Sequence, residues 1–203
     1  MPAPVERSTV LVLAPADGRE RFETWELFDR DAGKRLGLRR LTTGKGKPLS
    51  RPDVFDTGEA TLRSGAGHAW FLEDYRPLKR RSALAQNFVA LEAASALGNR
   101  VRRHLEHIDD LPHLFDLLVK AWDALAAGHV PAVVQVKMLY AWAQAEGYPV
   151  QQAWWAMLSA ADQAEAMTLL QRPLRDLAAD PATVGSILTS LCRYLAAETE
   201  LGI

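Results

Sequence analysis

Seven lysines and arginines gather between residues 34 and 51, and no acidic residue lies among them. Such side chains stay cationic at neutral pH and bind phosphate groups, and glycines at 44 and 46 would let backbone N–H groups approach a phosphate too. A run of this kind is also typical of a solvated surface loop, which is the competing interpretation. The residues expected to form the phosphate-binding surface are Lys34, Arg35, Arg39, Arg40, Lys45, Lys47 and Arg51.

A second basic cluster follows the last predicted strand and would extend the same surface. It consists of Arg76, Lys79, Arg80 and Arg81. A groove for single-stranded nucleic acid also needs aromatic side chains on which bases can stack. The nearby aromatic residues are Trp25, Trp70, Phe71 and Tyr75. Because most aromatic side chains on strands pack in the core, none of the four is singled out as a stacking platform.

Patterns for catalysis or metal binding are weaker. His104 and His107 are three residues apart on a predicted helix, as two metal ligands would be, and His113 follows. No complete ligand spacing is met, so we favour a polar helix end followed by a loop. The sequence contains no P-loop, G-x-G-x-x-G or G-x-S-x-G motif, and Cys192 is its one cysteine. We therefore expect no enzymatic activity, no metal and no cofactor.

Short strands must position the basic residues, because no helical period runs through the first 81 residues. Strands are predicted at 9–14, 21–28, 34–41, 54–63 and 68–78, with the last two forming a hairpin. In the third of these, Leu36, Leu38 and Leu41 form an apolar face opposite the cations, and Gly37 indicates a bulge or a close backbone approach. Five strands in so short a segment predict a small, closed or partly closed barrel of the OB type.

Helical periodicity takes over after residue 82. Helices are predicted at 83–108, 111–128 and 131–147, then in shorter segments and in a last helix after Pro181. Gly128 and Gly147 are expected to end two of them, and Asp180 to cap the last. Side chains at adjacent helix positions point about 100° apart, so we expect one of Trp154 and Trp155 to be buried and the other to lie at a groove.

Charge divides at the same boundary. The formal net charge of −1 combines +4 in residues 1–81 with −5 in residues 82–203. The sequence therefore predicts an α+β protein of two domains: a basic, five-stranded OB-type β-barrel at 1–81 and an acidic, all-helical domain at 82–203. The apolar run near the N-terminus is too short for a secretory signal or a membrane span, so we expect a cytoplasmic protein.

The order of these segments resembles that of the bacterial DNA recombination and repair protein RecO. The segments "ETWELFDRDAGKRLGLRRLTTGKGK" and "VFDTGEATLRSGAGHAWFLEDYRPL" are similar to that family's second to fifth strands. The segments "HLFDLLVKAWDALAAG" and "MLYAWAQAEGYPV" are similar to its helical pair, which has a Glu–Leu–Gly–Tyr type of stop. Two features depart from the family: a cysteine-bearing insertion after that stop and the arginine-rich first strand are both missing.

The resemblance implies a non-enzymatic recombination mediator. Such proteins bind single- and double-stranded DNA, anneal complementary strands, and act with RecR and the C-terminal tail of single-strand-binding protein in the nucleoid. Membrane and small-molecule partners are not expected. Core packing is the favoured interpretation of the paired tryptophans. In the alternative, an apolar pocket near them, with a cation beside it, would suit the hydrophobic end of that acidic tail. The candidate cations are Arg102, Arg103, Arg172, Arg175 and Arg193.

A different class of function stays open. The acidic helical half and the missing first-strand arginines would also suit a protein–protein adaptor, one that keeps the fold and has weak or lost DNA binding. DNA affinity at low and moderate salt distinguishes the two hypotheses.

Overall fold

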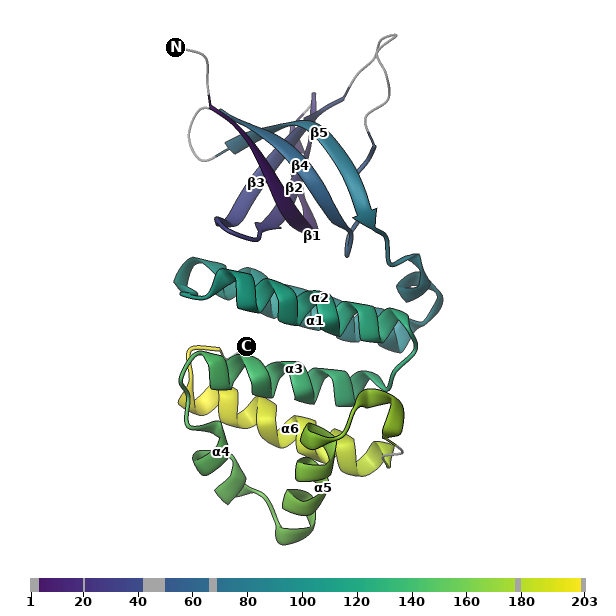
Figure 1. Ribbon diagram of the computed structural model, residues 1–203, viewed down its shortest axis with the longest axis vertical. Helices are drawn as coiled ribbons and strands as arrows, with labels where there is room; N and C mark the ends of the chain where they lie inside the picture. The colour runs from purple at the N-terminus through teal and green to yellow at the C-terminus, as the bar shows by residue number, and fades with distance from the viewer. Residues whose placement is uncertain (1–3, 20, 42–49, 66–68, 178–179, 202–203) are drawn as a thin grey trace. The chain divides into compact units, whose positions relative to one another are not determined.

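The protein is an α+β chain in which five strands precede the helices (Figure 1). The structure, a computed structural model, describes residues 4–19, 21–41, 50–65, 69–177 and 180–201. The strands are β1 (Val5–Arg19), β2 (Phe22–Asp29), β3 (Gly33–Arg40), β4 (Thr57–Ser64) and β5 (Ala69–Lys79). The helices are α1 (Phe88–His104), α2 (Leu111–Ala126), α3 (Pro131–Ala145), α4 (Val150–Ala153), α5 (Ala160–Gln171) and α6 (Pro181–Glu198). Short 3₁₀ turns are η1 (Ser82–Gln86), η2 (Leu105–His107), η3 (Trp155–Met157) and η4 (Leu174–Asp176).

Each strand is hydrogen-bonded to two neighbours, so the sheet closes on itself in the order β1-β2-β3-β5-β4. The β3–β5 pairing is parallel and short, from Leu36 opposite Ala69 to Leu38 opposite Phe71, and the other four pairings are antiparallel. β1 pairs with β2 on one side and with β4 on the other. Register shifts within its pairing to β2 let this long strand bend around the closed sheet.

Side chains from four of the five strands fill the interior of the sheet. They are Val10, Val12, Trp25, Leu27, Ala60, Leu62, Leu72 and Tyr75. β3 contributes Gly37 instead, where a Cβ atom would lie 2.9 Å from Cδ1 of Leu27. The pairing of β2 with β3 has no register shift. Of the two interpretations of Gly37, the close backbone approach is confirmed, whereas no bulge forms.

Packing in the helical part centres on three buried tryptophans. The Trp122 indole donates to the Ala94 carbonyl at 3.0 Å, which ties α2 to α1, and the Trp154 indole donates to the Ser190 hydroxyl of α6 at 3.2 Å. Trp142 is equally buried on α3, which lies beside α6 in Figure 1. These side chains remove large apolar surfaces from water and fix how the helices pack.

The predicted helix ends are confirmed. Gly128 and Gly147 follow α2 and α3 with φ of +85° and +81°, a conformation that glycine adopts at little steric cost. Asp180 caps α6, because its carboxylate accepts a hydrogen bond from the Thr183 N–H at 2.9 Å. These helix ends depend on single residues and their immediate neighbours, so they can be predicted from the sequence alone.

The chain divides into two compact units. The first, here called the β unit, comprises residues 1–81 together with Leu105–Phe115; the second, the helical unit, comprises Ser82–His104 and Asp116–Ile203. The sequence had assigned all residues after 81 to the helical domain. In the β unit the Phe28 ring of β2 instead packs edge-on against Phe115, with centroids 5.3 Å apart. The segment Leu105–Phe115 thus belongs with the strands.

Candidate nucleic-acid interface

Two of the three arginines of β3, Arg35 and Arg39, turn inward, which corrects the predicted orientation of this strand. Residues directly opposite each other on paired strands point to the same face, and Arg35 lies opposite Leu27, a core residue. Of the three leucines expected on the apolar face, Leu38 is buried, whereas Leu36 and Leu41 are exposed. The inversion follows from Gly37, which lies opposite Trp25 and so places its own side of β3 against the interior.

Arg35 is held by three neighbours. Its guanidinium lies 2.7 Å from the Glu6 carboxylate and 3.5 Å from that of Asp29, and it stacks 3.8 Å above the Trp70 ring. Only 13% of its side chain is exposed. A guanidinium so enclosed contributes to the packing of the sheet, and we remove Arg35 from the set of phosphate-contacting residues.

Arg39 shares an acid with Arg51. The Glu23 carboxylate lies 3.0 Å from the Arg39 guanidinium through one oxygen and 3.1 Å from that of Arg51 through the other. Arg39 is 15% exposed, so it also leaves the expected set. Arg51 is 68% exposed, and its guanidinium lies 5.9 Å from the centre of the Trp25 ring. Arg51 therefore presents its charge to solvent beside an indole.

Two further exposed arginines flank Arg51 at this end of the β2–β3 pair. Arg40 lies opposite Phe22 in the register, and the Leu41 N–H donates to the Arg21 carbonyl at 2.9 Å. Both arginines are exposed, and neither forms an ion pair within the described parts of the chain. We call Arg21, Arg40 and Arg51 the hairpin-end cluster. Lys45 and Lys47 follow in the sequence but lie outside the described residues.

Arg21 escaped the sequence-based prediction because it precedes β2 and is far from the basic run in the sequence. Its closeness to Leu41 follows from the antiparallel register of β2 and β3. Pairing the two predicted strands, which start and end near these residues, would have revealed it.

The second predicted basic cluster divides among different sites. Arg76 lies 2.7 Å from the Glu59 carboxylate on the outer face of β4 and β5. Arg80 lies 3.5 Å from the Asp56 carboxylate and donates to the Arg51 carbonyl at 3.1 Å. Arg81 is buried and donates to the Phe55 carbonyl and the Thr57 hydroxyl, so it too leaves the expected set. Lys79 is exposed at the end of β5.

Acids and bases alternate on the outer face formed by β1, β4 and β5. A polar cavity of about 360 Å³ opens there, and its charged lining residues are Arg7, Glu59, Asp74 and Arg76. Arg63 is paired with Glu73 next to it and lies 5.0 Å from the Phe71 ring. A mixed-charge face of this kind attracts a polyanion weakly. Among the described residues, the hairpin-end cluster is the better candidate for phosphate contacts.

The aromatic residues follow the same division. Trp25 and Tyr75 are in the core, and Trp70 covers Arg35. Phe22 and Phe71 are half-buried, with ring centroids 5.8 Å apart, and Phe22 lies next to the hairpin-end cluster. These two rings are the ones placed to meet a base beside the cations.

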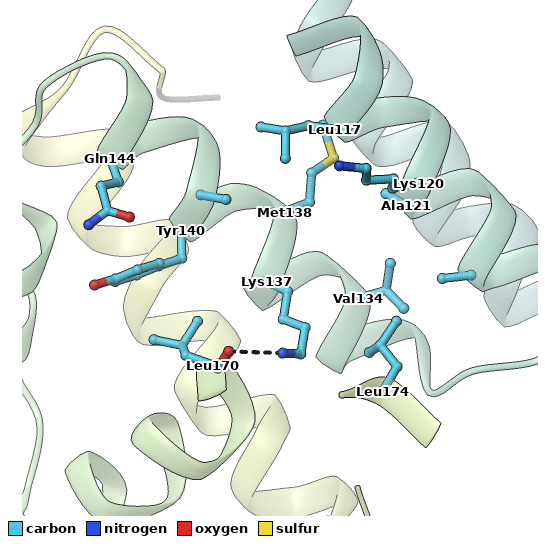
Figure 2. A pocket seen from close by; sticks show the side chains of 12 residues that line it. Leu117, Lys120, Ala121, Val134, Lys137, Met138, Tyr140, Gln144, Leu170 and Leu174 are labelled. Carbon is cyan, nitrogen blue, oxygen red and sulfur yellow. Dashed lines mark hydrogen bonds between the residues drawn. The ribbon is translucent and has the colours of Figure 1, made fainter. Parts of the chain in front are cut away.

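The helical unit contains an apolar pocket of about 410 Å³ (Figure 2). Leu117, Lys120 and Ala121 of α2 line one side, opposite Val134 and Met138 of α3. Leu170 and Leu174 complete the lining from α5 and η4. The pocket is thus a largely apolar hollow with two lysines in its wall.

The two lysines differ in what they can offer a ligand. The Lys137 ammonium donates to the carbonyls of Leu170 at 3.1 Å and of Arg172 at 2.8 Å, which satisfies the C-terminal end of α5. Burial lowers the pKa of Lys137 and raises that of the Tyr140 hydroxyl. Lys120 is exposed at the rim. None of the five arginines expected beside such a pocket lines it.

A second, smaller hollow adjoins the first and shares Tyr140, Gln144 and Leu170 with it. Trp155 and Met167 line its far side. Trp154 is fully buried, whereas Trp155 is half-buried with its ring 6.0 Å from that of Trp154. The prediction that one of the two would be buried and the other would lie at a groove is confirmed.

Other sequence features give no site. His104 stacks edge-on against Trp142 at 6.0 Å, and no group of three metal-ligating side chains forms within the described ranges. No helix among the described residues has both the length and the apolar character needed to cross a membrane. No protein-family model matches the chain, and a search of the curated proteins finds no match.

Proposed function

We propose that this protein is a non-enzymatic DNA-binding recombination mediator of the RecO type, acting in the cytoplasm on nucleoid DNA. The closed sheet would be an OB-type barrel, in which the β2–β3 side and adjacent loops bind oligonucleotides. The closed order β1-β2-β3-β5-β4, with its parallel β3–β5 pairing, supports this assignment, as does the position of the helices after the strands.

One observation carries the DNA-binding part of the proposal. Arg21, Arg40 and Arg51 lie together at the end of the β2–β3 pair, exposed and next to Phe22. The sequence then adds Lys45 and Lys47 between Arg40 and Arg51. Cations for the phosphates and an aromatic ring for a base are the two components of a sequence-independent single-strand site.

The partner part of the proposal rests on the pocket of the helical unit. An acidic peptide with a hydrophobic end, such as the C-terminal tail of single-strand-binding protein, would insert that end between α2 and α3 and place its carboxylates near Lys120. RecR and double-stranded DNA complete the proposed set of partners, as the resemblance to RecO implies.

The test measures fluorescence anisotropy of a labelled single-stranded oligonucleotide over a range of salt concentrations. Each phosphate contact on a single strand contributes about 0.7 to the slope of log affinity against log salt. Replacing Arg40 and Arg51 by alanine should therefore reduce the slope by about 1.4 and weaken binding at low salt. The matched control replaces Arg63 and Arg76, which removes the same charge from ion pairs on the mixed-charge face.

Comparing the two variants distinguishes direct contact of DNA with the hairpin-end cluster from general electrostatic attraction to the β unit. If both lower affinity and slope equally, the DNA does not recognise the hairpin-end cluster. If neither changes them, the proposed interface is wrong.

A second function is favoured by a specific observation, the pairing of so many cations of the β unit with carboxylates. Arg35, Arg39 and Arg76 all lie within 3.0 Å of an acid. In this alternative the protein is an adaptor that binds proteins through the helical unit and DNA weakly or not at all. Binding of the acidic tail peptide without salt-sensitive binding of DNA would support it.

A further inference from the structure

A buried carboxylate organises the segment that carries Arg51. Asp56 is 1% exposed, and one of its oxygens accepts hydrogen bonds from the Asp53 N–H at 3.1 Å and the Tyr75 hydroxyl at 3.3 Å. The same oxygen lies 3.5 Å from the Arg80 guanidinium. Buried polar groups with several partners fix one local geometry, because each lost partner leaves a group desolvated and unpaired.

Arg80 links this carboxylate to Arg51. One guanidinium nitrogen faces Asp56, and another donates to the Arg51 carbonyl at 3.1 Å. The Arg51 side chain extends from that point to Glu23 and the Trp25 ring. A continuous series of polar contacts thus runs from the interior of the β unit to an exposed cation of the hairpin-end cluster.

The backbone between Arg51 and β4 is also constrained. Phe55 has φ of +71°, a region that residues with a side chain adopt at a cost. Its N–H donates to the Val12 carbonyl at 2.9 Å, and its own carbonyl accepts from Arg81 at 2.5 Å. Such a conformation persists where surrounding contacts over-determine it, and here those contacts set the direction in which the chain enters β4.

We propose that Asp56 and Arg80 are positioning residues for DNA binding, which hold Arg51 where it meets a phosphate. This inference rests on the proposed function. It changes the role expected of Arg80, from a phosphate contact to a support for one.

The direction in which one substitution changes DNA affinity distinguishes a positioning role from a purely electrostatic one. Asp56→Asn removes a negative charge close to Arg80, so bulk electrostatics predicts tighter binding of DNA. Positioning predicts weaker binding, because the uncharged amide attracts Arg80 less and the Arg51 backbone is released. Burial raises the pKa of Asp56, so the fold accommodates a neutral group at this position and the variant should fold.

The experiment compares wild type, Asp56→Asn and Glu59→Gln by oligonucleotide anisotropy at low salt. Glu59 is an exposed acid of the same unit, paired with Arg76, so its replacement changes the net charge equally without touching the segment. We expect Asp56→Asn to weaken binding by about tenfold, near the lower end of what a hydrogen bond to a charged group contributes. Glu59→Gln should leave affinity unchanged or slightly raised.

A double-mutant cycle on Arg51 and Arg80 provides the second readout. If Arg80 acts through Arg51, Arg80→Ala weakens binding in the wild type and has no further effect in the Arg51→Ala background. Additive losses would mean that Arg80 contacts DNA itself, and would overturn the inference. Hydrogen exchange of the peptide covering residues 50–57 should accelerate in Asp56→Asn and Arg80→Ala but not in Glu59→Gln.

The outcomes for the two proposals are distinguishable. Salt-insensitive or absent binding by the wild type contradicts the proposed function. Normal binding by the wild type, with Asp56→Asn folded and binding as tightly or more tightly, overturns the positioning role alone.

Discussion

The β unit and the helical unit use their cations in different ways. In the β unit, Arg35 and Arg39 lie against carboxylates and support the sheet, and exposed charge remains at the hairpin-end cluster. In the helical unit, Lys137 satisfies backbone carbonyls while Lys120 lies at the rim of an apolar pocket. The comparison teaches that the number of cations in a basic stretch of sequence overestimates how many can bind a ligand. Folding pairs some of them with carboxylates or carbonyls of the same chain.

Arg35→Ala should have the largest effect, and it should be an effect on stability. The substitution leaves the Glu6 and Asp29 carboxylates without their cation and uncovers Trp70. Because Glu6 is partly exposed, we expect a loss of about 2–3 kcal/mol, below the usual cost of breaking a fully buried pair. Urea denaturation followed by circular dichroism measures it.

The control for this comparison is Arg76→Ala, which removes the exposed pair with Glu59 and should cost less than about 1 kcal/mol. An Arg35→Ala protein of wild-type stability that binds DNA poorly would restore Arg35 to the interface and break the distinction drawn here.

Gly58→Ala should destabilise the β unit next most strongly. A Cβ atom at residue 58 would lie 2.4 Å from the Tyr75 ring, whose hydroxyl donates to Asp56. The ring or the strand must move, at a cost of about 1–3 kcal/mol. Gly185→Ala is the matched control in the helical unit: nothing lies within 4 Å of its Cβ position on α6, and alanine there should stabilise by up to about 1 kcal/mol.

Thermal denaturation of both variants checks the prediction. A Gly58→Ala protein that melts with the wild type would show that Tyr75 and Asp56 are not held as tightly as the structure indicates.

The sequence predicted local features well and pairing-dependent ones poorly. The helix ends depend on the conformation of one residue or of its immediate neighbours, as at Gly128, Gly147 and Asp180. Their roles could therefore be predicted from the sequence. The face on which Arg35 lies depends on its partner strand, and a shift of one residue reverses it. For this reason the predicted leucine face is wrong for Leu36 and Leu41, although Leu38 is buried: Gly37 rather than a leucine lies opposite Trp25.

The candidate site shows the same limit. The exposed members Arg40 and Arg51 were predicted from composition alone, whereas the burial of Arg81 and the proximity of Arg21 depend on contacts between residues distant in the sequence. The pocket of the helical unit was expected near Trp154 and Trp155, and its smaller extension does include Trp155. Its cations are lysines on α2 and α3, which no sequence pattern distinguished from solvated side chains.

The pH dependence of stability tests whether Asp56 is buried as an ionisable group in the β unit. Burial raises its pKa above 3.8, so the folded state binds this proton more tightly than the unfolded state does. The contribution of Asp56 to the free energy of unfolding is therefore fully present below pH 3.8, and it is lost as the pH rises through the raised pKa of the folded state. The stability of the wild type minus that of Asp56→Asn should fall over that window.

Urea denaturation of the two proteins, from below pH 3.8 to neutral pH, measures this difference and cancels the other titrating groups. A difference that is flat or increases with pH would contradict the burial of an ionisable group at Asp56.

Lys120→Glu should have the smallest effect, a few-fold loss of affinity for the acidic tail peptide. The residue lies at the rim of the apolar pocket, where a charge acts through solvent and contributes less than the buried contacts. Arg193→Glu makes the same change of charge at an exposed position of α6 that does not line the pocket. Calorimetry with the peptide should separate the two, and equal losses would indicate attraction by the whole unit.

The salt dependence of single-strand binding by the wild type tests the central claim most directly. If Arg21, Arg40 and Arg51 contact phosphates together with the two lysines of residues 42–49, the log–log slope should be near −3.5, at about 0.7 per contact. A slope near zero would contradict the account, because the exposed cations of the β unit would then have no part in binding a polyanion.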